Sequence, residues 1–489
     1  MRCHLDANGG LPMARPALTA WLTVAASPPA PAAARAAAAA LSRELAAEHH
    51  FELHGQAAFT VAYASSVAEA NCALITGAVR RYAVGTRRLP HIVTSAGDPP
   101  SVLACCRALR AERACELTVL PLGRAGAGLG AVDPQHVRAV LRPNTCLVTI
   151  AAANADTGII NDMRAIVAAV REGARDIARR GARDIARRAA QRARRDAHAA
   201  HTSIPVHSDA TQLIGRGPFQ PAALGLDAWS VGFAPLGGAP GLAALGVRQT
   251  FIAGYGLASY VSQTVSQTVS QTVCTGEPGD PQRASALGDP EGATGLAAAV
   301  AATAAALAAP RPSVRELAAA RDAIAAALNV LFLDDCPADA PPSIDGRSPP
   351  GDPPHEGSAE GRAALASGAA VFWVAPDRRC SAAQNVLPNT LLLAIARPGF
   401  SAEEACAELA WHGITVGRAS AATVAALNLP ARLETLRISI GNNMVSENAE
   451  ISTLRSVIWG KRERSRERSR DRSRSRDRSR SRVSSPEEP

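Results

Sequence analysis

Lysine is almost absent from this chain of 489 residues. Lys461 is the single example, and arginine supplies the other positive side chains. Arginine stays protonated in proteins and is not a competent amine nucleophile. Residues 1–460 therefore offer no side-chain amine that can condense with a carbonyl group.

Long apolar runs and metal-binding motifs are also missing. No stretch of about 18 strongly apolar residues appears, so no membrane span is expected. Residues 1–4 do not begin a basic region followed by an apolar stretch, so no secretory signal is expected either. The ten cysteines stand singly except for Cys105 and Cys106, without CxxC or Cys/His spacing. This pattern predicts no metal site, and reduced thiols in a cytoplasmic or nuclear protein.

Aromatic residues make up 3% of the chain, whereas apolar residues make up 47%, much of it alanine. Such a composition is typical of a globular protein in which helices are favoured. The length allows one large domain and a smaller one.

The positive charge is concentrated in two segments. The net charge is +9, of which residues 461–489 contribute +6 and residues 171–196 another +6, leaving −3 for the rest. The folded body is therefore expected to be close to neutral, with two basic appendages.

Two short tandem repeats read as surface insertions. Gly-Ala-Arg-Asp-Ile-Ala-Arg-Arg occurs at 173–180 and again at 181–188, and Val-Ser-Gln-Thr occurs three times over 261–272. The first predicts an Arg-rich helical extension and the second an extended loop or strand. Residues 337–368, rich in Pro, Gly, Asp and Ser, are expected to form a long loop, and the Arg/Ser-rich stretch 461–482 a disordered tail.

The remaining segments alternate between helix and strand patterns. Alanine-rich helices are expected at 29–48, 64–83, 101–113, 294–309, 312–329 and 402–412. Short apolar runs with strand character occur at 91–94, 117–120, 146–150, 204–207, 391–395 and 436–440. This alternation predicts an α/β fold with a mostly parallel sheet.

The order of several motifs resembles one family, the cysteine desulfurases and selenocysteine lyases. Leu-Asp-Ala-Asn at 5–8 is similar to the family's N-terminal Leu-Asp-x-Asn. Residues 59–71 resemble its phosphate-binding turn, residues 91–95 the strand that enters its active site, and residues 141–158 its Arg-Pro-x-Thr-x-Leu-Val-Thr-Ile…Ala-Asn-Asn-Glu-Thr-Gly segment. Four further matches follow in the same order, at 206–212, 224–227, 387–390 and 436–441. Each motif is weak alone, but their collinear order over about residues 4–457 is specific, and the selenocysteine lyase branch looks nearest.

The resemblance implies a fold-type I, pyridoxal-phosphate (PLP) transferase-like architecture. It implies a large domain over 1–310, with insertions at 171–203 and 261–273. A smaller α+β domain would cover 311–460, with a disordered loop at 337–368, and a tail would cover 461–489. The resemblance also implies a homodimer, or a heterodimer with a homologue.

The resemblance assigns roles to eight residues. The cofactor would contact Asp209 at its pyridine nitrogen, and also Gln212, Asn154 and Glu69. The substrate carboxylate would bind Arg437, a role that suits a bidentate guanidinium, with Asn8 beside it. Ser420 stands where the family has its nucleophilic cysteine, and His207 is the candidate proton acceptor near Asp209.

The chain departs from the family where the chemistry takes place. Residues 229–238 replace the Gly-His-Lys-Phe-Tyr-Gly-Pro segment whose lysine forms the Schiff base with PLP. Ser420 cannot form a persulfide, the cofactor-stacking histidine falls at about Pro99, and the phosphate turn at 62–67 has lost its glycines. The resemblance implies PLP as the cofactor. The chain, however, lacks the lysine that would hold PLP covalently.

Three functions remain open from the sequence. The first is a catalytically inactive protein that binds a partner or an active homologue. The second is an active lyase or aminotransferase that holds PLP noncovalently through Asp209, Gln212 and Arg437. The third is an RNA-associated protein that acts through the tail at 461–482, which would bind phosphate backbones in a salt-dependent way.

Overall fold

The computed structural model describes most of the chain outside its insertions and its C-terminal segment. The described residues are 3–4, 6–9, 11–26, 41, 59–86, 88–123, 128–189, 203–248, 290–309, 312–332, 370–375, 386–429, 433–441 and 448–459. The expected loops at 261–272 and 337–368, most of the expected helix at 29–48, and the tail at 461–482 lie outside these residues.

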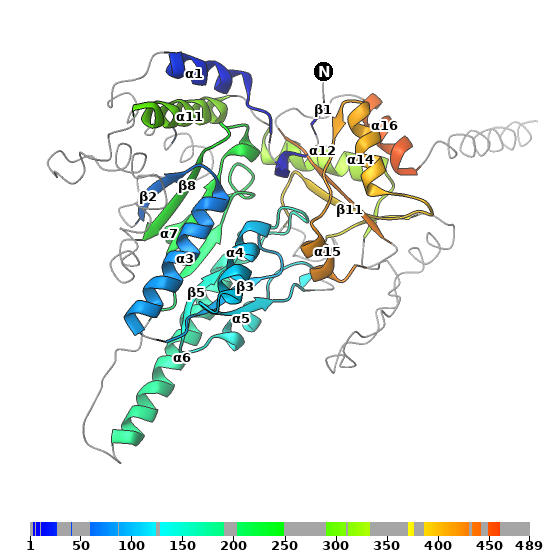
Figure 1. Cartoon of the computed structure of the whole chain (residues 1–489). Helices are drawn as coiled ribbons and strands as arrows, with labels where there is room; N and C mark the ends of the chain where they lie inside the picture. The colour runs from blue at the N-terminus through cyan, green and yellow to red at the C-terminus, as the bar shows by residue number, and fades with distance from the viewer. Residues whose placement is uncertain are drawn as a thin grey trace, which may run out of the picture.

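A seven-stranded sheet forms the centre of the molecule (Figure 1). Its order is β2-β8-β7-β6-β5-β3-β4. The pairs from β7 to β4 are parallel, and β8 pairs antiparallel with both β7 and β2. The strands are β2 (Phe59–Ala64), β3 (His91–Ser95), β4 (Glu116–Leu120), β5 (Thr145–Thr149), β6 (Val206–Asp209), β7 (Ala228–Gly232) and β8 (Ala243–Arg248). The predicted mostly parallel sheet is confirmed.

Helices cover both faces of this sheet. They are α3 (Val67–Thr86), α4 (Pro100–Ala111), α5 (Pro134–Val140), α6 (Met163–Ala189) and α7 (Pro221–Leu224). Successive strand residues enter different cores: Ile92 joins the cluster under α3 and α4, whereas Val93 joins the cluster that contains Ile166 of α6. Because strand side chains alternate between faces, a sheet covered on both sides has fully buried strands.

A second, four-stranded sheet has the order β13-β11-β10-β9. Its strands are β9 (Leu331–Phe332), β10 (Ala370–Trp373), β11 (Thr390–Ala396) and β13 (Glu434–Ser439). The helices that follow or precede them are α12 (Val314–Ala327), α14 (Ala402–Trp411), α15 (Ala421–Leu427) and α16 (Asn448–Trp459). This smaller α+β unit agrees with the expected fold class.

The N-terminal segment forms a two-stranded sheet of its own and contacts the four-stranded sheet through a bridge between Asp6 and Ser439 of β13. β1 (Cys3–His4) pairs in parallel with β12 (Ile414–Thr415), and η1 (Ala7–Gly9) follows it. α1 (Arg15–Ala26) then packs against α11 (Pro290–Ala308) beside the large sheet (Figure 1). The N-terminal segment therefore contacts elements from both halves of the chain.

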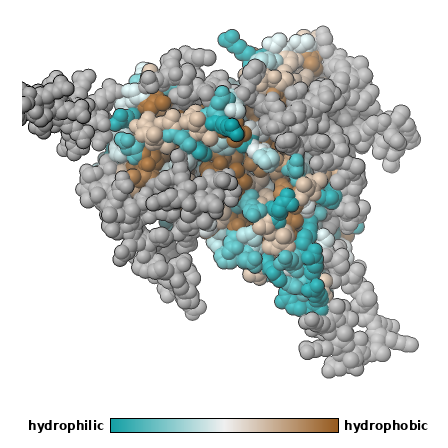
Figure 2. All heavy atoms as spheres, turned by 180° about the vertical axis from the view of Figure 1, so that it is seen from behind, coloured by the Kyte–Doolittle hydropathy of each residue, from teal (hydrophilic) through white to brown (hydrophobic). Residues whose placement is uncertain are grey.

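The Arg-rich repeat continues a helix, as predicted. α6 runs through both repeat copies as far as Ala189. Arg138 of α5 forms ion pairs with two residues one turn apart near the middle of α6, Glu172 at 2.9 Å and Asp176 at 2.6 Å. Figure 2 shows hydrophilic residues gathered over α6, where Arg175 and Arg179 are exposed.

Candidate functional site

The candidate site is a cavity of about 330 Å³ at the carboxyl ends of the parallel strands. Loops after β3, β5 and β6 form one wall, and residues beside α15 and β13 form the other. Such crevices outside the carboxyl ends of strands are the usual ligand sites of α/β sheets. Five of the predicted residues line it: Asn154, Asp209, Gln212, Ser420 and Arg437.

Asp209 ends strand β6 and is almost completely buried. One carboxylate oxygen accepts a hydrogen bond from Asn71 Nδ2 at 2.8 Å, and the other accepts from the Thr211 backbone amide at 2.9 Å. Burial raises the pKa of the Asp209 carboxyl, and these hydrogen bonds oppose the rise. Both oxygens of the residue predicted to contact the cofactor are thus already bonded within the protein.

The amides of Asn154 and Gln212 also have partners inside the protein. Asn154 Oδ1 accepts from the backbone amides of Asp156 and Thr157, and its Nδ2 donates to the Gly97 carbonyl at 2.7 Å. Gln212 Nε2 donates to the Asn8 carbonyl at 3.1 Å, and its Oε1 accepts from Arg216 at 2.7 Å. These amides therefore hold the cavity wall in shape.

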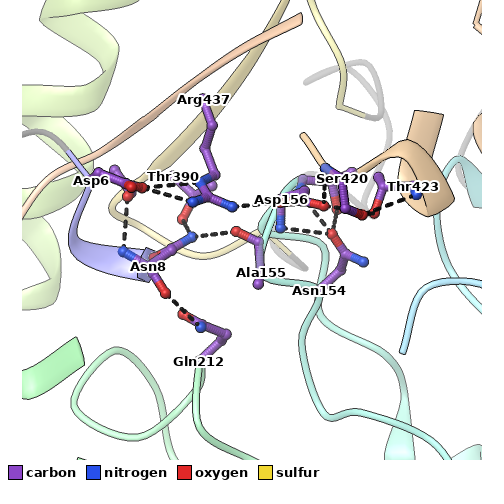
Figure 3. A network of polar contacts seen from close by, with 12 residues as sticks. Asp6, Asn8, Asn154, Ala155, Asp156, Gln212, Thr390, Ser420, Thr423 and Arg437 are labelled. Carbon is purple, nitrogen blue, oxygen red and sulfur yellow. Dashed lines mark hydrogen bonds and ion pairs between the residues drawn. The ribbon is translucent and has the colours of Figure 1, made fainter. Parts of the chain in front are cut away.

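Arg437 is held between two carboxylates from distant parts of the sequence (Figure 3). Its Nη2 lies 2.8 Å from Asp6 Oδ1, and its Nη1 lies 2.5 Å from Asp156 Oδ1. The side chains of Arg437 and Asp156 are only 12% and 9% exposed, so solvent screens this pair weakly. The guanidinium predicted to bind the substrate carboxylate is neutralised by the protein itself.

Ser420 caps the helix α15. Its Oγ accepts from the Thr423 backbone amide at 3.2 Å, and its own backbone amide donates to Asp156 Oδ2 at 2.9 Å. A serine before a helix commonly satisfies a free amide in this way. The residue at the family's cysteine position thus contributes to the cavity wall and to the helix start.

Glu69 and Asn8 lie close to the site without lining the cavity. Glu69, in the first turn of α3, accepts from the backbone amide of Ser65 at 2.9 Å and closes the turn before that helix. Asn8 is buried beneath the cavity and donates to the Ala155 carbonyl at 2.7 Å and to Thr390 Oγ1 at 2.9 Å (Figure 3).

His207 also lies outside the cavity lining, one layer deeper than Asp209 on the same strand. Its Nδ1 is 2.8 Å from Thr149 Oγ1, and its Nε2 is 3.1 Å from Ser230 Oγ. Ser230 Oγ donates to Asn71, the residue that bonds Asp209, so a buried polar chain connects the two. Burial lowers the pKa of His207 to about 3. This histidine is therefore a neutral residue of the core, and its role as a proton acceptor stays a prediction.

Sequence reasoning missed the carboxylates that organise the site. Asp98 lines the cavity and accepts from the backbone amides of Ser95 and Ala151, and burial raises its pKa to about 6. Asp6 and Asp156 both lie within motifs that resemble the family. Their pairing with Arg437 carries no sequence signal, because it joins positions 431 and 281 residues apart.

The residues present do not fit PLP in the covalently held form that the resemblance implies. After β7, the chain forms the short 3-10 helix η3 (Ala234–Leu236), preceded by buried Phe233. No side chain there carries an amine, and the described part of the chain contains no lysine. The cavity lining also includes no cysteine or histidine.

Among the residues that the structure describes, no group of three or more His, Cys, Asp or Glu side chains is placed to hold a metal ion. None of their helices is both long and apolar enough to cross a membrane.

Comparison with known proteins gives consistent matches. The family model for class V aminotransferases matches residues 40–177. A NifS-like protein of African swine fever virus is 38% identical over 108 residues, which are 22% of this chain and 27% of the relative. A cysteine desulfurase, IscS, of an Anaeromyxobacter strain is 28% identical over 206 residues, 42% of each chain. The matched part is thus less than half the length of these curated relatives.

Solved structures match over nearly the whole chain. A NifS-like protein of Rickettsia africae superposes with a TM-score of 0.57 at 16% identity, covering 94% of this chain and 98% of the other. The cysteine desulfurase CsdA of Escherichia coli superposes with a TM-score of 0.55 at 13% identity, covering 94% of each chain. These likenesses support the fold. The family model and the curated relatives add that part of the chain is similar in sequence to class V aminotransferases, NifS-like proteins and cysteine desulfurases.

Proposed function

We propose that this protein is a non-catalytic relative of the cysteine desulfurases, which keeps the family's scaffold and acts by binding a protein partner. The observation that carries the proposal is the absence of lysine from residues 1–460. The PLP chemistry of the family requires an amine on the protein, and arginine cannot supply it.

The state of Arg437 supports the proposal. An amino-acid substrate would have to displace Asp6 or Asp156 before its carboxylate could form a two-pronged contact with the guanidinium. The displaced carboxylate would then be left partly buried without its cation, which is costly. The site is therefore poorly suited to bind a free amino acid.

A borohydride experiment tests the missing amine. The purified full chain is mixed with PLP, its absorbance spectrum is recorded, and borohydride is added before the intact mass is measured. We expect no covalent adduct within residues 1–457. The Lys461→Arg variant is the control, because it removes the only lysine and leaves the N-terminal amine. An adduct on a side chain within 1–457 would overturn the proposal.

Restoring the thiol provides a second test. Ser420→Cys places a nucleophile at the family's position, but it supplies no amine. We expect no sulfide release from cysteine above the wild-type background in the presence of PLP. Sulfide is measured against an active cysteine desulfurase as the positive control. Turnover by the variant would show that the site works without the lysine.

The partner role has its own test. The chain is mixed with an active cysteine desulfurase, and the mixture is analysed by size-exclusion chromatography with light scattering. A complex of this chain with the desulfurase supports the proposal. A homodimer of this chain supports only the expectation that the family's dimer is retained. A monomer that remains separate from the homologue contradicts the partner role.

A noncovalent PLP enzyme is the second candidate, favoured by the position of the cavity. Asn154, Asp209 and Gln212 line a space whose volume, about 330 Å³, lies within the range of small-molecule sites. This candidate predicts a yellow protein that retains PLP on desalting, and that loses it in Asp209→Asn. It also predicts turnover of cysteine or selenocysteine.

The RNA-associated function rests on residues outside the described part of the chain. It remains a prediction from the Arg/Ser alternation at 461–482. Salt-dependent retention on RNA that disappears when 461–482 is deleted would support it.

A further inference from the structure

The part of α6 that contains the tandem repeat has an exposed face rich in arginine. Arg175, Arg179 and Arg180 of the first copy are exposed, and we call them the arginine face. The second half of the helix extends past the end of the large sheet (Figure 1), and hydrophilic residues gather over it (Figure 2). Residues 171–189 hold seven arginines and three acidic residues, so this segment has a net charge of +4.

Neighbouring acidic side chains do not neutralise the arginine face. Glu172 and Asp176 form ion pairs with Arg138 of α5, at 2.9 and 2.6 Å. Among the described side chains, Arg179 is the one member of the face with an ion pair, 3.8 Å from Asp176, and its side chain is 72% exposed. Arg180 donates to the backbone carbonyl of Asp176 at 3.3 Å. The positive charge of this face therefore remains available to a partner.

The length of the repeat aligns arginines along the helix. Positions four residues apart lie on the same face of an α-helix, and the eight-residue unit equals two such steps. One ridge of α6, about 18 Å long at 1.5 Å per residue, therefore holds by sequence position Arg175, Arg179, Arg183 and Arg187. Like charges four residues apart destabilise a helix. Such a row is stabilised by a partner whose negative charges also follow a line.

We propose that the arginine face of α6 binds the phosphate backbone of a nucleic acid. A guanidinium group donates two parallel hydrogen bonds to a phosphate, and arginine supplies every positive side chain of this helix. α6 contains no aromatic residue on which a base could stack. Contacts to phosphates alone carry no sequence information, so the binding is independent of base sequence.

Two other kinds of anionic partner fit this face less well. A helix that binds a membrane surface places an apolar face in the lipid, whereas the apolar residues Ile166, Val170 and Ile177 of α6 pack against the protein core. Interfaces between proteins depend on buried aromatic and aliphatic anchors. Interfaces with nucleic acid are more polar and much more positively charged. The arginine face has the second character.

This inference is separate from the functions proposed above. It does not depend on the cavity, because none of the three arginines lines it. It also differs from the RNA-associated function of the tail at 461–482, because α6 lies within the described part of the chain.

Fluorescence anisotropy of the full chain tests the proposal with two labelled probes, a DNA duplex and a single-stranded RNA. Binding is measured at several salt concentrations for the wild type and for the triple variant Arg175→Gln, Arg179→Gln, Arg180→Gln. Each phosphate contact adds about 0.9 to the salt dependence on the duplex and about 0.7 on the single strand. On a double-logarithmic plot of binding constant against salt concentration, we expect the slope of the variant to be less steep by about 2 to 3. An unchanged slope would overturn the proposal.

A matched control loses the same charge at another place. Its substitutions, Arg81→Gln, Arg107→Gln and Arg110→Gln, are at exposed positions of α3 and α4. The control should keep the slope of the wild type. Equal losses in both triple variants would contradict the proposal, because they would show that net charge alone decides the binding. The tail at 461–482 is present in all three proteins, so its contribution cancels from the comparison.

Two competitors distinguish the classes of partner. Polyglutamate represents an acidic protein, and vesicles of phosphatidylcholine with phosphatidylserine represent a membrane surface. We expect the wild type to keep both nucleic-acid probes in the presence of either competitor at an equal concentration of negative charge. Displacement by polyglutamate or by the vesicles under these conditions would reject nucleic acid as the preferred partner of the arginine face.

Discussion

At the scale of single residues, Arg437 connects two parts of the chain that are distant in the sequence. Its guanidinium joins Asp6 from the N-terminal segment to Asp156 from the loop after β5. The second oxygen of Asp156 accepts from Thr423 Oγ1 at 2.7 Å and from the Ser420 amide. Asp156 therefore supports both the arginine and the start of α15.

Removing Asp156 should be strongly destabilising. We expect Asp156→Ala to lower the free energy of unfolding by about 3–5 kcal/mol, because it leaves a buried cation with one partner fewer. Arg418→Ala is the control, since its ion pair with Glu403 is 51% and 81% exposed. We expect Arg418→Ala to lower the free energy of unfolding by less than about 1 kcal/mol. Urea denaturation of both variants measures the difference, and equal losses would contradict our account of the site.

Acid sensitivity follows from the buried histidines. Burial lowers the pKa of His207 to about 3 and that of His91 to about 4, from 6.5. Below pH 6.5 the unfolded chain binds a proton at each histidine and the folded chain does not. Each therefore stabilises the fold above pH 6.5, and this stability is lost as the pH falls, by about 1.4 kcal/mol per pH unit. Asp98 has the opposite effect, because burial raises its pKa from 3.8 to about 6. As the pH falls from about 6 to 3.8, the folded chain binds a proton at Asp98 that the unfolded chain does not, and this contribution to the free energy of unfolding increases.

The variant His207→Gln isolates one of these contributions. Its free energy of unfolding should fall less steeply than that of the wild type between pH 6.5 and 4, by about 1.4 kcal/mol per pH unit. Urea denaturation at several pH values gives both slopes. Parallel curves would show that His207 is not held neutral in the folded protein.

At the scale of elements, the tandem repeat in α6 places two equivalent glycines in different surroundings. A Cβ on Gly181 would meet nothing within 4 Å, whereas a Cβ on Gly173 would lie 2.5 Å from Leu141 Cδ1. The same eight-residue unit therefore packs against α5 in its first copy, and its glycine is free of such contact in the second.

The two glycines should respond differently to alanine. Gly181→Ala should stabilise the protein by about 0.5–1 kcal/mol, because alanine favours a helix interior. Gly173→Ala should stabilise the protein less than Gly181→Ala does, or destabilise it, because the Leu141 side chain must shift. Thermal unfolding of the two variants provides the comparison, and equal gains would contradict the contact with Leu141.

Local patterns were good predictors of the elements. Helices expected at 64–83, 101–113 and 312–329 appear as α3, α4 and α12, each within a few residues, and the six apolar runs correspond to β3, β4, β5, β6, β11 and β13. Strands β2, β7 and β8 were not predicted as strands, although β7 and β8 are fully buried for most of their length. Short apolar runs rich in alanine and glycine have little strand propensity. They form strands because they pair with neighbouring strands of the sheet.

At the scale of the whole molecule, Asn8 connects the chain start to both sheets. Its backbone amide donates to Ser439 Oγ at 2.9 Å, its side chain bonds Ala155 and Thr390, and its Oδ1 accepts from Arg216 at 2.7 Å. Arg216 is almost completely buried, and burial lowers its pKa to about 9.

Loss of the Asn8 side chain should weaken the whole fold. We expect Asn8→Ala to lower the free energy of unfolding by about 2–4 kcal/mol, because four partners of its side chain lose a hydrogen bond. Asn8→Asp is the informative comparison: it keeps an acceptor for Arg216 and loses the donor to Ala155 and Thr390. A loss below about 1 kcal/mol for Asn8→Ala in urea denaturation would contradict this linking role.

The sequence by itself determined the alternation of strands and helices, the family resemblance and the absence of a reactive amine. Each of these follows from residue identity and from spacing over a few positions. The tertiary structure alone decided that Asp6 and Asp156 neutralise Arg437 and that His207 lies beneath the site. These contacts join residues 58 to 431 positions apart. At such separations, the packing of the sheets and helices selects which residues become partners. Local propensity does not encode this selection.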